Sequence, residues 1–318
     1  MKPQAVVLLN MGAPNSLFEV EIFLKNMFND PFILGIKNNF LRKMLASFIT
    51  NSRLEEAKKN YAQIGGKSPL MTHTVNLVKK LNALDSKRHY TFAMRYTPPF
   101  AYDVLDELQK NGTDSIILFS LYPQFSYTTI HSSILDAKDA LQKLQFNPTL
   151  QEFSSYHTHT DYIECIVKSI KETLGTSNAS DFVLLLSSHS LPQSRIDAGD
   201  PYQKHCKATA KALESALLAQ NICFKEIALC YQSKIGRMKW LEPSTAQSIK
   251  KYKNEKIILF PLSFTLDNSE TDFELSILYK NLAKQLNVPE YRVCKCFNDS
   301  EHFAQSIINI IQGGQSEG

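Results

Sequence analysis

The stretch "FVLLLSSHSLPQSRIDAGDPY" (residues 182–202) joins an apolar run to a sharply turning loop. Its first five residues are all apolar, which is typical of a strand that a parallel sheet buries on both faces. His189 stands where the run stops, and two prolines and a glycine then mark a loop. Ligands of such sheets bind beyond the carboxyl ends of the strands, so this strand exit is a candidate for function.

Apolar runs of the same kind recur along the chain and alternate with segments of helical periodicity. The runs lie at 5–9, 90–94, 115–120, 182–186, 226–229 and 256–260. Strands that alternate with helices form parallel sheets covered on both faces, so an α/β fold with doubly wound sheets is predicted. The runs fall into two groups around residue 150, which predicts two similar lobes facing each other across a cleft, with 144–160 as the crossover.

Composition excludes several classes of protein. The chain has 318 residues and a net charge of +4, which is too small to indicate a nucleic-acid partner. Its six cysteines contain no C-x-x-C pair, which indicates free thiols in a reducing compartment. No signal-peptide cleavage site and no window of ~20 apolar residues occur, so a cytoplasmic protein is expected.

Three common motifs of α/β enzymes are absent. No G-x-G-x-x-G occurs, and "IGGKSP" (64–69) lacks the first glycine and the preceding strand of a phosphate loop. His189 lies in Ser-His-Ser, not in the G-x-S-x-G of a hydrolase, and no H-E-x-x-H is present. An imidazole at a strand exit can still serve as a metal ligand or as a base near neutral pH. The alternative is that it hydrogen-bonds a nearby backbone group, and both stay open.

The last strand exit carries a cluster of acidic residues, in "FPLSFTLDNSETDFEL" (260–275). Glu270 and Glu274 share a helix face, where like charges cost roughly a few tenths of a kcal/mol. Such a cluster suits a cation or a released proton. The alternative is a helix capping box, because Asp267 and Glu270 have the required spacing.

Seven blocks, in order over essentially the whole chain, resemble the ferrochelatases, which insert ferrous iron into a porphyrin at the end of haem synthesis. The blocks are "LLNMGAP" (8–14), "YAQIGGKSPL" (61–70), "RYTPP" (95–99), "YPQFSYTTIHSS" (122–133), "SSHSLPQSRIDAGDPY" (187–202), "CYQSKIGRMKWLEPST" (230–245) and "FPLSFTLDNSETDFEL" (260–275). By this resemblance the chain is identified as a member of the family.

The resemblance implies a fold of the chelatase type. Two similar Rossmann-like lobes, each a parallel sheet flanked by helices, are expected at 1–150 and 151–299, with the active-site cleft between them. The C-terminal helix, at about 300–318, is expected to return to the first lobe. The implied activity is that of a lyase that inserts Fe²⁺ into a porphyrin, protoporphyrin IX, to give haem with release of two protons.

The resemblance also implies the site residues. His189 matches the family's active-site histidine, and Glu270 matches the carboxylate that faces it across the macrocycle. Both are expected to be catalytic and to contact the metal, and which of them takes the pyrrole protons stays open. The other pocket positions are expected at Met11, Arg53, Arg95, Tyr122, Ser126 and Glu274.

Some features depart from the family's pattern. Asn268 stands where relatives often carry a histidine, and an amide cannot take up a proton at neutral pH. Ala62 and Gln63 replace a pair of arginines, so contacts to the propionates are expected to differ. The chain lacks the cysteine-bearing extension through which some relatives bind a [2Fe–2S] cluster, so no permanently bound cofactor is expected and Fe²⁺ is a substrate.

The expected partners are a porphyrin and ferrous iron, with no nucleic acid, and the chain is expected to be a monomer or a homodimer. The family resemblance makes segment 27–50 the lip of the pocket, where an apolar rim can touch a membrane. The alternative for this segment is an amphipathic helix packed in the core.

Two other functions stay open. One is a non-catalytic tetrapyrrole carrier on the same fold, which Asn268 allows although His189 and Glu270 are intact. The other is a chelatase for another tetrapyrrole and metal, such as cobalt in a corrinoid pathway.

Overall fold

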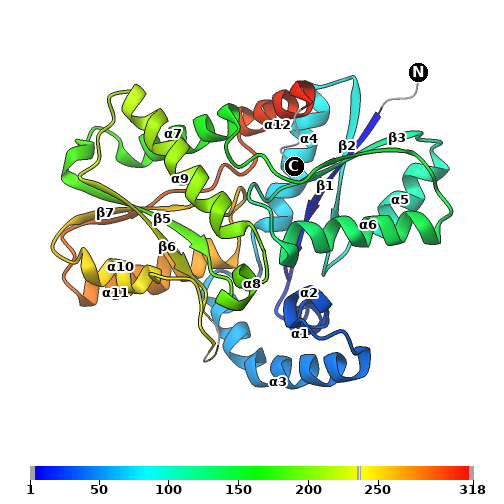
Figure 1. Ribbon diagram of the computed structural model, residues 1–318, viewed down its shortest axis with the longest axis horizontal. Coiled ribbons are helices and arrows are strands. Elements are labelled where there is room, and N and C mark those ends of the chain that lie inside the picture. The colour runs from blue at the N-terminus through cyan, green and yellow to red at the C-terminus, as the bar shows by residue number, and fades with distance from the viewer. Residues whose placement is uncertain (1–3, 235, 237, 315–318) are drawn as a thin grey trace. The chain divides into compact units, whose positions relative to one another are not determined.

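The computed structural model describes residues 4–234, 236 and 238–314 (Figure 1). The chain divides between Ser155 and Tyr156 into two compact units, and the described residues after Ile310 belong to the first unit. Each unit contains a four-stranded sheet in which every paired strand is parallel to its neighbour. The prediction of an α/β fold with two Rossmann-like lobes is confirmed.

The sheet of unit 1 has the strand order β2-β1-β3-β4. Its strands are β1 (Gln4–Asn10), β2 (Arg88–Met94), β3 (Ser115–Ser120) and β4 (Thr149–Phe153). Its helices are α1 (Val20–Phe28), α2 (Pro31–Leu34), α3 (Asn39–Gln63), α4 (Leu70–Leu84), α5 (Ala101–Lys110), η1 (Tyr127–His131) and α6 (Ser132–Lys143). The central strand β1 is buried from Ala5 onward, and a neighbouring strand pairs with each of its edges.

The sheet of unit 2 repeats this arrangement in the order β6-β5-β7-β8. Its strands are β5 (Phe182–His189), β6 (Glu226–Gln232), β7 (Lys256–Pro261) and β8 (Tyr291–Val293). Its helices are α7 (Thr160–Leu174), η2 (Ala179–Asp181), α8 (Gln193–Asp197), α9 (Tyr202–Ala219), α10 (Thr245–Lys251), η3 (Glu270–Leu278), α11 (Tyr279–Gln285) and α12 (Glu301–Gly313).

Side chains alternate between the two faces of β5, and this alternation determines on which face the His189 side chain lies. Val183 and Leu185 lie in a buried cluster that also contains Leu275 of η3. Because residues two apart share a face of a strand, Ser187 and His189 continue the same face toward the strand end. The histidine therefore emerges on the side of the sheet that η3 covers.

Two strands were missed in the sequence, and one predicted boundary falls inside a strand. β4 lies within the segment expected to be a crossover, and it alternates exposed and partly buried residues because it is an edge strand. Residue 150, the predicted end of the first lobe, is part of β4 and pairs with Ile116 of β3. β8 is also an edge strand and has just three residues, too few for a periodic signal.

The C-terminal helix, which was expected to pack back on the first lobe, is shared between the two units. Residues of α12 up to Ile310 belong to unit 2, and the described residues from Ile311 onward belong to unit 1. The Phe303 ring lies 5.1 Å from that of Phe297, and Asn309 Nδ2 donates to Asp161 Oδ1 of α7 over 3.2 Å. These contacts link the first part of the helix to other residues of unit 2, and residues 315–318 of the predicted segment lie outside the described residues.

Segment 27–50 forms the end of α1, the short helix α2 and the first half of α3. The alternative of a core helix is not supported for α3, because Phe40 and Phe48 are 71% and 70% exposed. Leu41, Met44 and Leu45 are exposed beside them. Among the described residues, no helix is long and apolar enough to cross a membrane.

Gly12, which follows β1, offers a test of how closely the strand exits pack. Its φ is +81°, and an added Cβ would lie 2.1 Å from Thr97 Oγ1. Gly65 has a similar φ of +89° but open space around it.

Alanine at such a φ costs roughly 1–2 kcal/mol, and overpacking a buried site adds about 1–3 kcal/mol. Chemical denaturation is therefore expected to show a larger loss of unfolding free energy for Gly12→Ala than for Gly65→Ala, and equal losses would contradict the packing.

Candidate functional site

His189 and Glu270 meet at one edge of the sheet of unit 2. His189 is the last residue of β5, and Glu270 begins η3 after the turn that follows β7. Because β5 and β7 pair in parallel, both chain segments leave the sheet at the same edge. His189 Nδ1 lies 3.0 Å from Glu270 Oε2, and the two side chains are 35% and 27% exposed, so ligands can reach them.

This contact corrects the expectation that the two residues face each other across a macrocycle. A porphyrin cannot lie between two atoms that share a hydrogen bond. The physical reason is the strand order, which places the exits of β5 and β7 side by side. The imidazole and the carboxylate are therefore adjacent in unit 2 and do not face each other across a gap.

Three donors converge on the same oxygen of Glu270. Besides His189 Nδ1, these are Gln232 Nε2 at 3.2 Å and Ser233 Oγ at 2.9 Å. The amide of Gln232 is oriented by Ser187, whose hydroxyl donates to Gln232 Oε1 over 2.6 Å. Glu270 Oε2 is thus fixed by its surroundings, and among the described residues no hydrogen bond to Glu270 Oε1 is found.

Glu274 lies one turn further along η3 and is held by the same loop. The backbone N–H of Ser233 donates to Glu274 Oε1 over 2.8 Å, and the Ser233 hydroxyl contacts Glu274 Oε2. Tyr279 OH donates to Glu274 Oε1 over 2.7 Å. η3 is a π-helix, a geometry that is frequent at functional sites and that no pattern in the sequence predicts.

The helix cap that the sequence suggested is wrong. Asp267 does not cap η3, because its carboxylate accepts from Asn298 Nδ2 at 2.7 Å and from the Cys296 N–H at 3.2 Å. Asn268 takes the capping role instead, since its Oδ1 accepts the Glu270 N–H over 2.8 Å. The residue that departs from the family's pattern therefore holds the start of the helix that presents Glu270.

Burial and charge act against each other at these three groups. Burial lowers the pKa of His189, but the charge and hydrogen bond of Glu270 outweigh it and raise that pKa above the usual value. Burial likewise raises the pKa of Glu270, and His189, Ser233 and Gln232 reverse the shift, so it ends below its usual value. Burial, followed by the charge of Glu270, raises the pKa of Glu274. Glu270 therefore stays a carboxylate that stabilises a proton taken up by His189, and Glu274 is a second carboxyl that holds protons more readily.

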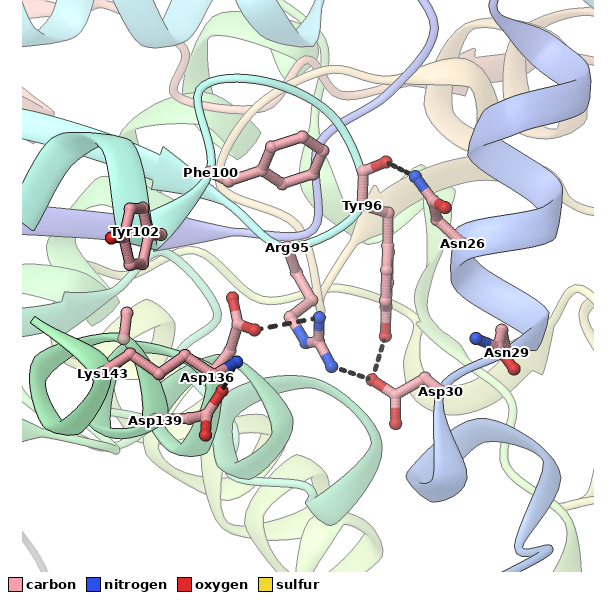
Figure 2. Close-up of a pocket in the computed structure, with 11 residues that line it drawn as sticks. Asn26, Asn29, Asp30, Arg95, Tyr96, Phe100, Tyr102, Asp136, Asp139 and Lys143 are labelled. Carbon is pink, nitrogen blue, oxygen red and sulfur yellow. Dashed lines mark hydrogen bonds and ion pairs between the residues drawn. The ribbon is translucent and has the colours of Figure 1, made fainter. Parts of the chain in front are cut away.

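Arg95 lies in a network of charges in unit 1, around a pocket of about 310 Å³ (Figure 2). Its guanidinium pairs with Asp30 at 3.2 Å and with Asp136 at 3.3 Å. Asp30 is buried and also accepts from Tyr96 OH over 2.9 Å. Arg95 is thus an internal counter-ion for two carboxylates, a role that the sequence did not indicate.

The other predicted pocket residues of unit 1 lie near strand exits or on α3. Met11 follows β1 and packs partly buried against the cluster that contains Tyr96. Tyr122 follows β3, and Ser126 is buried and caps η1 by accepting the Thr128 N–H over 3.2 Å. Arg53 is half-buried on α3.

The sequence did not single out Gln232, Ser233 and Tyr279, which complete the hydrogen-bond network of the site. Gln232 and Ser233 lie in the block "CYQSKIGRMKWLEPST" (230–245), so they were within reach of the resemblance. The φ of +65° at Ser233 has no signal in the sequence, because serine has no preference for that region.

A family model and two relatives with known names all indicate the same family. A family model described as Ferrochelatase matches residues 3–314. Ferrochelatase of Helicobacter hepaticus is 69% identical over 302 residues, which are 95% of this chain and 97% of that protein. Ferrochelatase of Wolinella succinogenes is 52% identical over 312 residues, which are 98% of this chain and 99% of that protein.

Two solved structures share the fold at low identity. SirB from Bacillus subtilis with Fe³⁺ has a TM-score of 0.60 at 11% identity, over 98% of this chain and 94% of that chain. CbiX, described as the terminal enzyme for biosynthesis of siroheme in denitrifying bacteria, has a TM-score of 0.51 at 11% identity, over 98% of this chain and 100% of that chain. This likeness shows the fold alone and matches the predicted chelatase type.

The pairing of His189 with Glu270 can be tested by titration. Glu270→Gln removes the charge that raises the pKa of His189, so burial is left to act and that pKa is expected to fall. Histidine-selective NMR across a pH series measures it. Glu301→Gln, which neutralises an exposed carboxylate of α12, is the control and is expected to leave the titration of His189 in place. An unchanged or higher pKa of His189 in Glu270→Gln would refute the pairing.

Proposed function

Because the chain belongs to the ferrochelatase family of lyases, which insert iron into a porphyrin, we propose that it metallates protoporphyrin IX through His189 and Glu270. The observation that carries this proposal is the contact of 3.0 Å between His189 Nδ1 and Glu270 Oε2 at two adjacent strand exits. The preference for protoporphyrin IX comes from the family resemblance.

The reaction sets three requirements. Two pyrrole protons must leave the ring, and hydrated Fe²⁺ must lose water before it can enter. A flat ring keeps the lone pairs of its nitrogens in the plane, so bending the ring exposes them, at a strain of about 1–5 kcal/mol drawn from binding energy. The protein must therefore supply a base, an acidic group that receives protons, and a surface that grips the ring.

His189 supplies the base through its other ring nitrogen. Since Nδ1 donates to Glu270, Nε2 is left as the atom that accepts a pyrrole proton or contacts the iron. The carboxylate stabilises the imidazolium that forms, as in other imidazole–carboxylate pairs. A histidine in this setting is a competent base near neutral pH.

Glu274 supplies the acidic group that receives protons. Its carboxyl is linked to Glu270 through Ser233, and its raised pKa suits a group that holds a proton on the way out. In the overall balance, Fe²⁺ replaces two N–H protons of the ring, and both protons leave to solvent. The iron is a substrate here, and His189 with Glu270 forms its proposed contact before insertion.

We also propose that the reaction needs no resident cofactor and no [2Fe–2S] cluster. Support comes from the thiols, because Cys165, Cys206, Cys230, Cys294 and Cys296 are buried. Burial raises the pKa of Cys165 and of Cys230 to about 11, which disfavours the thiolates that bind iron–sulfur clusters.

The two other functions gain no support from the site. A non-catalytic carrier was suggested by Asn268, but this residue caps η3 and leaves the His189–Glu270 pair intact. Support for a chelatase that acts on another tetrapyrrole would have to come from SirB and CbiX. Each is 11% identical to this chain, and this likeness supports the fold alone.

Anaerobic assays with Fe²⁺ and protoporphyrin test the proposal. His189→Ala is expected to slow iron insertion by about 10²–10⁴-fold, the typical value of a positioned base. Porphyrin affinity, read from fluorescence quenching, is expected to stay within about threefold, since one imidazole is a small part of the area that grips the ring. His89→Ala, at an exposed histidine of β2, is the control. Full activity of His189→Ala would overturn the proposal.

A peripheral contact with the cytoplasmic face of a membrane is a further part of the proposed function. The exposed residues Phe40, Met44 and Phe48 follow at intervals of four along α3 and form one apolar stripe. The exposed lysines Lys37 and Lys43 lie beside it in sequence and suit anionic lipid headgroups.

Flotation with vesicles that contain phosphatidylglycerol tests this contact. The unchanged protein is expected to float with the vesicles at low salt, and the double variant Phe40→Ser and Phe48→Ser to remain behind. Leu218→Ser, at a residue of α9 that is 55% exposed, is the matched control and is expected to float. Failure of the unchanged protein to float would remove the membrane contact without touching the chemistry.

A further inference from the structure

We propose that Ser233 is a positioning residue that holds Glu270 and Glu274 in fixed relative places, a role that rests on the proposed function of the site. Ser233 follows β6, which pairs with β5, so its loop leaves the sheet beside His189. From there it contacts both glutamates of η3, Glu270 and Glu274. No other side chain among the described residues has a hydrogen bond with both.

The contacts of Ser233 are made by backbone and side chain together. Its hydroxyl lies 2.9 Å from Glu270 Oε2 and also contacts Glu274 Oε2, while its N–H donates to Glu274 Oε1 over 2.8 Å. Two carboxylates on one helix face repel each other when both are charged. A donor that bridges them keeps Glu270 from turning away from His189.

The hydrogens of this bridge can be counted. A serine hydroxyl has one proton, so it can bond both carboxyl groups at once when it donates to one and accepts a proton from the other. Glu274 is the carboxyl whose pKa is raised, by burial and then by the charge of Glu270. When Glu274 has taken up a proton, the chain of bonds runs from Glu274 through Ser233 to Glu270, whose carboxylate accepts from His189.

The backbone of Ser233 shows that its position is imposed. Its φ of +65° lies in the left-handed region, which non-glycine residues adopt at a cost. Of the other described non-glycine residues with positive φ, Asn221, Asn287 and Asn298 are asparagines, which tolerate this region well, and the fourth is Gln145. Such strain persists where the surroundings over-determine a residue, and here the N–H and the hydroxyl both bind η3.

Two variants of Ser233 separate the hydroxyl from the backbone. Both Ser233→Gly and Ser233→Ala lack the hydroxyl, but glycine accepts the φ of +65° freely and alanine does not. Asn287→Gly is the control for the backbone, because it places glycine at a φ of +55° away from the site. Ser276→Ala is the control for hydroxyl loss on η3, since its Oγ donates to the Thr271 carbonyl over 2.8 Å.

Steady-state iron insertion and porphyrin binding are measured for all four variants. Loss of a bond to a charged group is expected to lower kcat by about tenfold or more in both Ser233 variants, with KM and Kd for protoporphyrin within about twofold. The controls are expected to keep kcat. Unchanged kcat in Ser233→Gly would overturn the proposal, as would a loss confined to Ser233→Ala, which would assign the effect to the backbone.

NMR of His189 without substrates keeps this inference separate from the proposed function. Ser233→Gly is expected to shift the ring signals of His189, because Glu270 is no longer held, and Ser276→Ala is expected to leave them unchanged. An inactive unchanged protein would defeat the proposed function, whatever the signals show. An active protein whose His189 signals do not respond to Ser233→Gly would defeat the positioning role alone.

Discussion

The site depends on one hydrogen bond, between the imidazole of His189 and the carboxylate of Glu270. Parallel pairing of β5 with β7 brings the two residues together although 80 residues separate them in the chain. The charge of each group and the bond between them raise the pKa of His189 and lower that of Glu270. It also assigns the ring nitrogens, because Nδ1 is occupied and Nε2 remains for chemistry.

Much of the fold follows from apolar runs such as Phe182–Leu186, which are long enough to identify central strands. The edge strands were not found in this way, because β4 has two apolar residues among its five and β8 has three residues in all. The candidate residues of the site were found through the strand exits and the resemblance. The arrangement of these residues was not predicted. Strand order is set by packing over the whole unit, so no local pattern in the sequence shows that β5 pairs with β7.

Competition from tertiary contacts explains why the predicted helix cap is wrong. The spacing of Asp267 and Glu270 fits a capping box, yet Asp267 is drawn to Asn298 and the Cys296 N–H, contacts from a distant part of the chain. Asn268 then caps η3 in its place. In this case tertiary contacts override a local pattern. Arg95 was expected to bind substrate, and it also serves as the counter-ion that the buried carboxylate of Asp30 needs.

The central claim is that Glu270 holds the proton of the neutral imidazole on Nδ1 and frees Nε2 for the porphyrin and the iron. Nitrogen-15 NMR of the imidazole ring reads this tautomer directly in the protein without substrates, at a pH above the pKa of His189. The account predicts a protonated Nδ1 and a bare Nε2. A proton on Nε2 with a bare Nδ1 would contradict it.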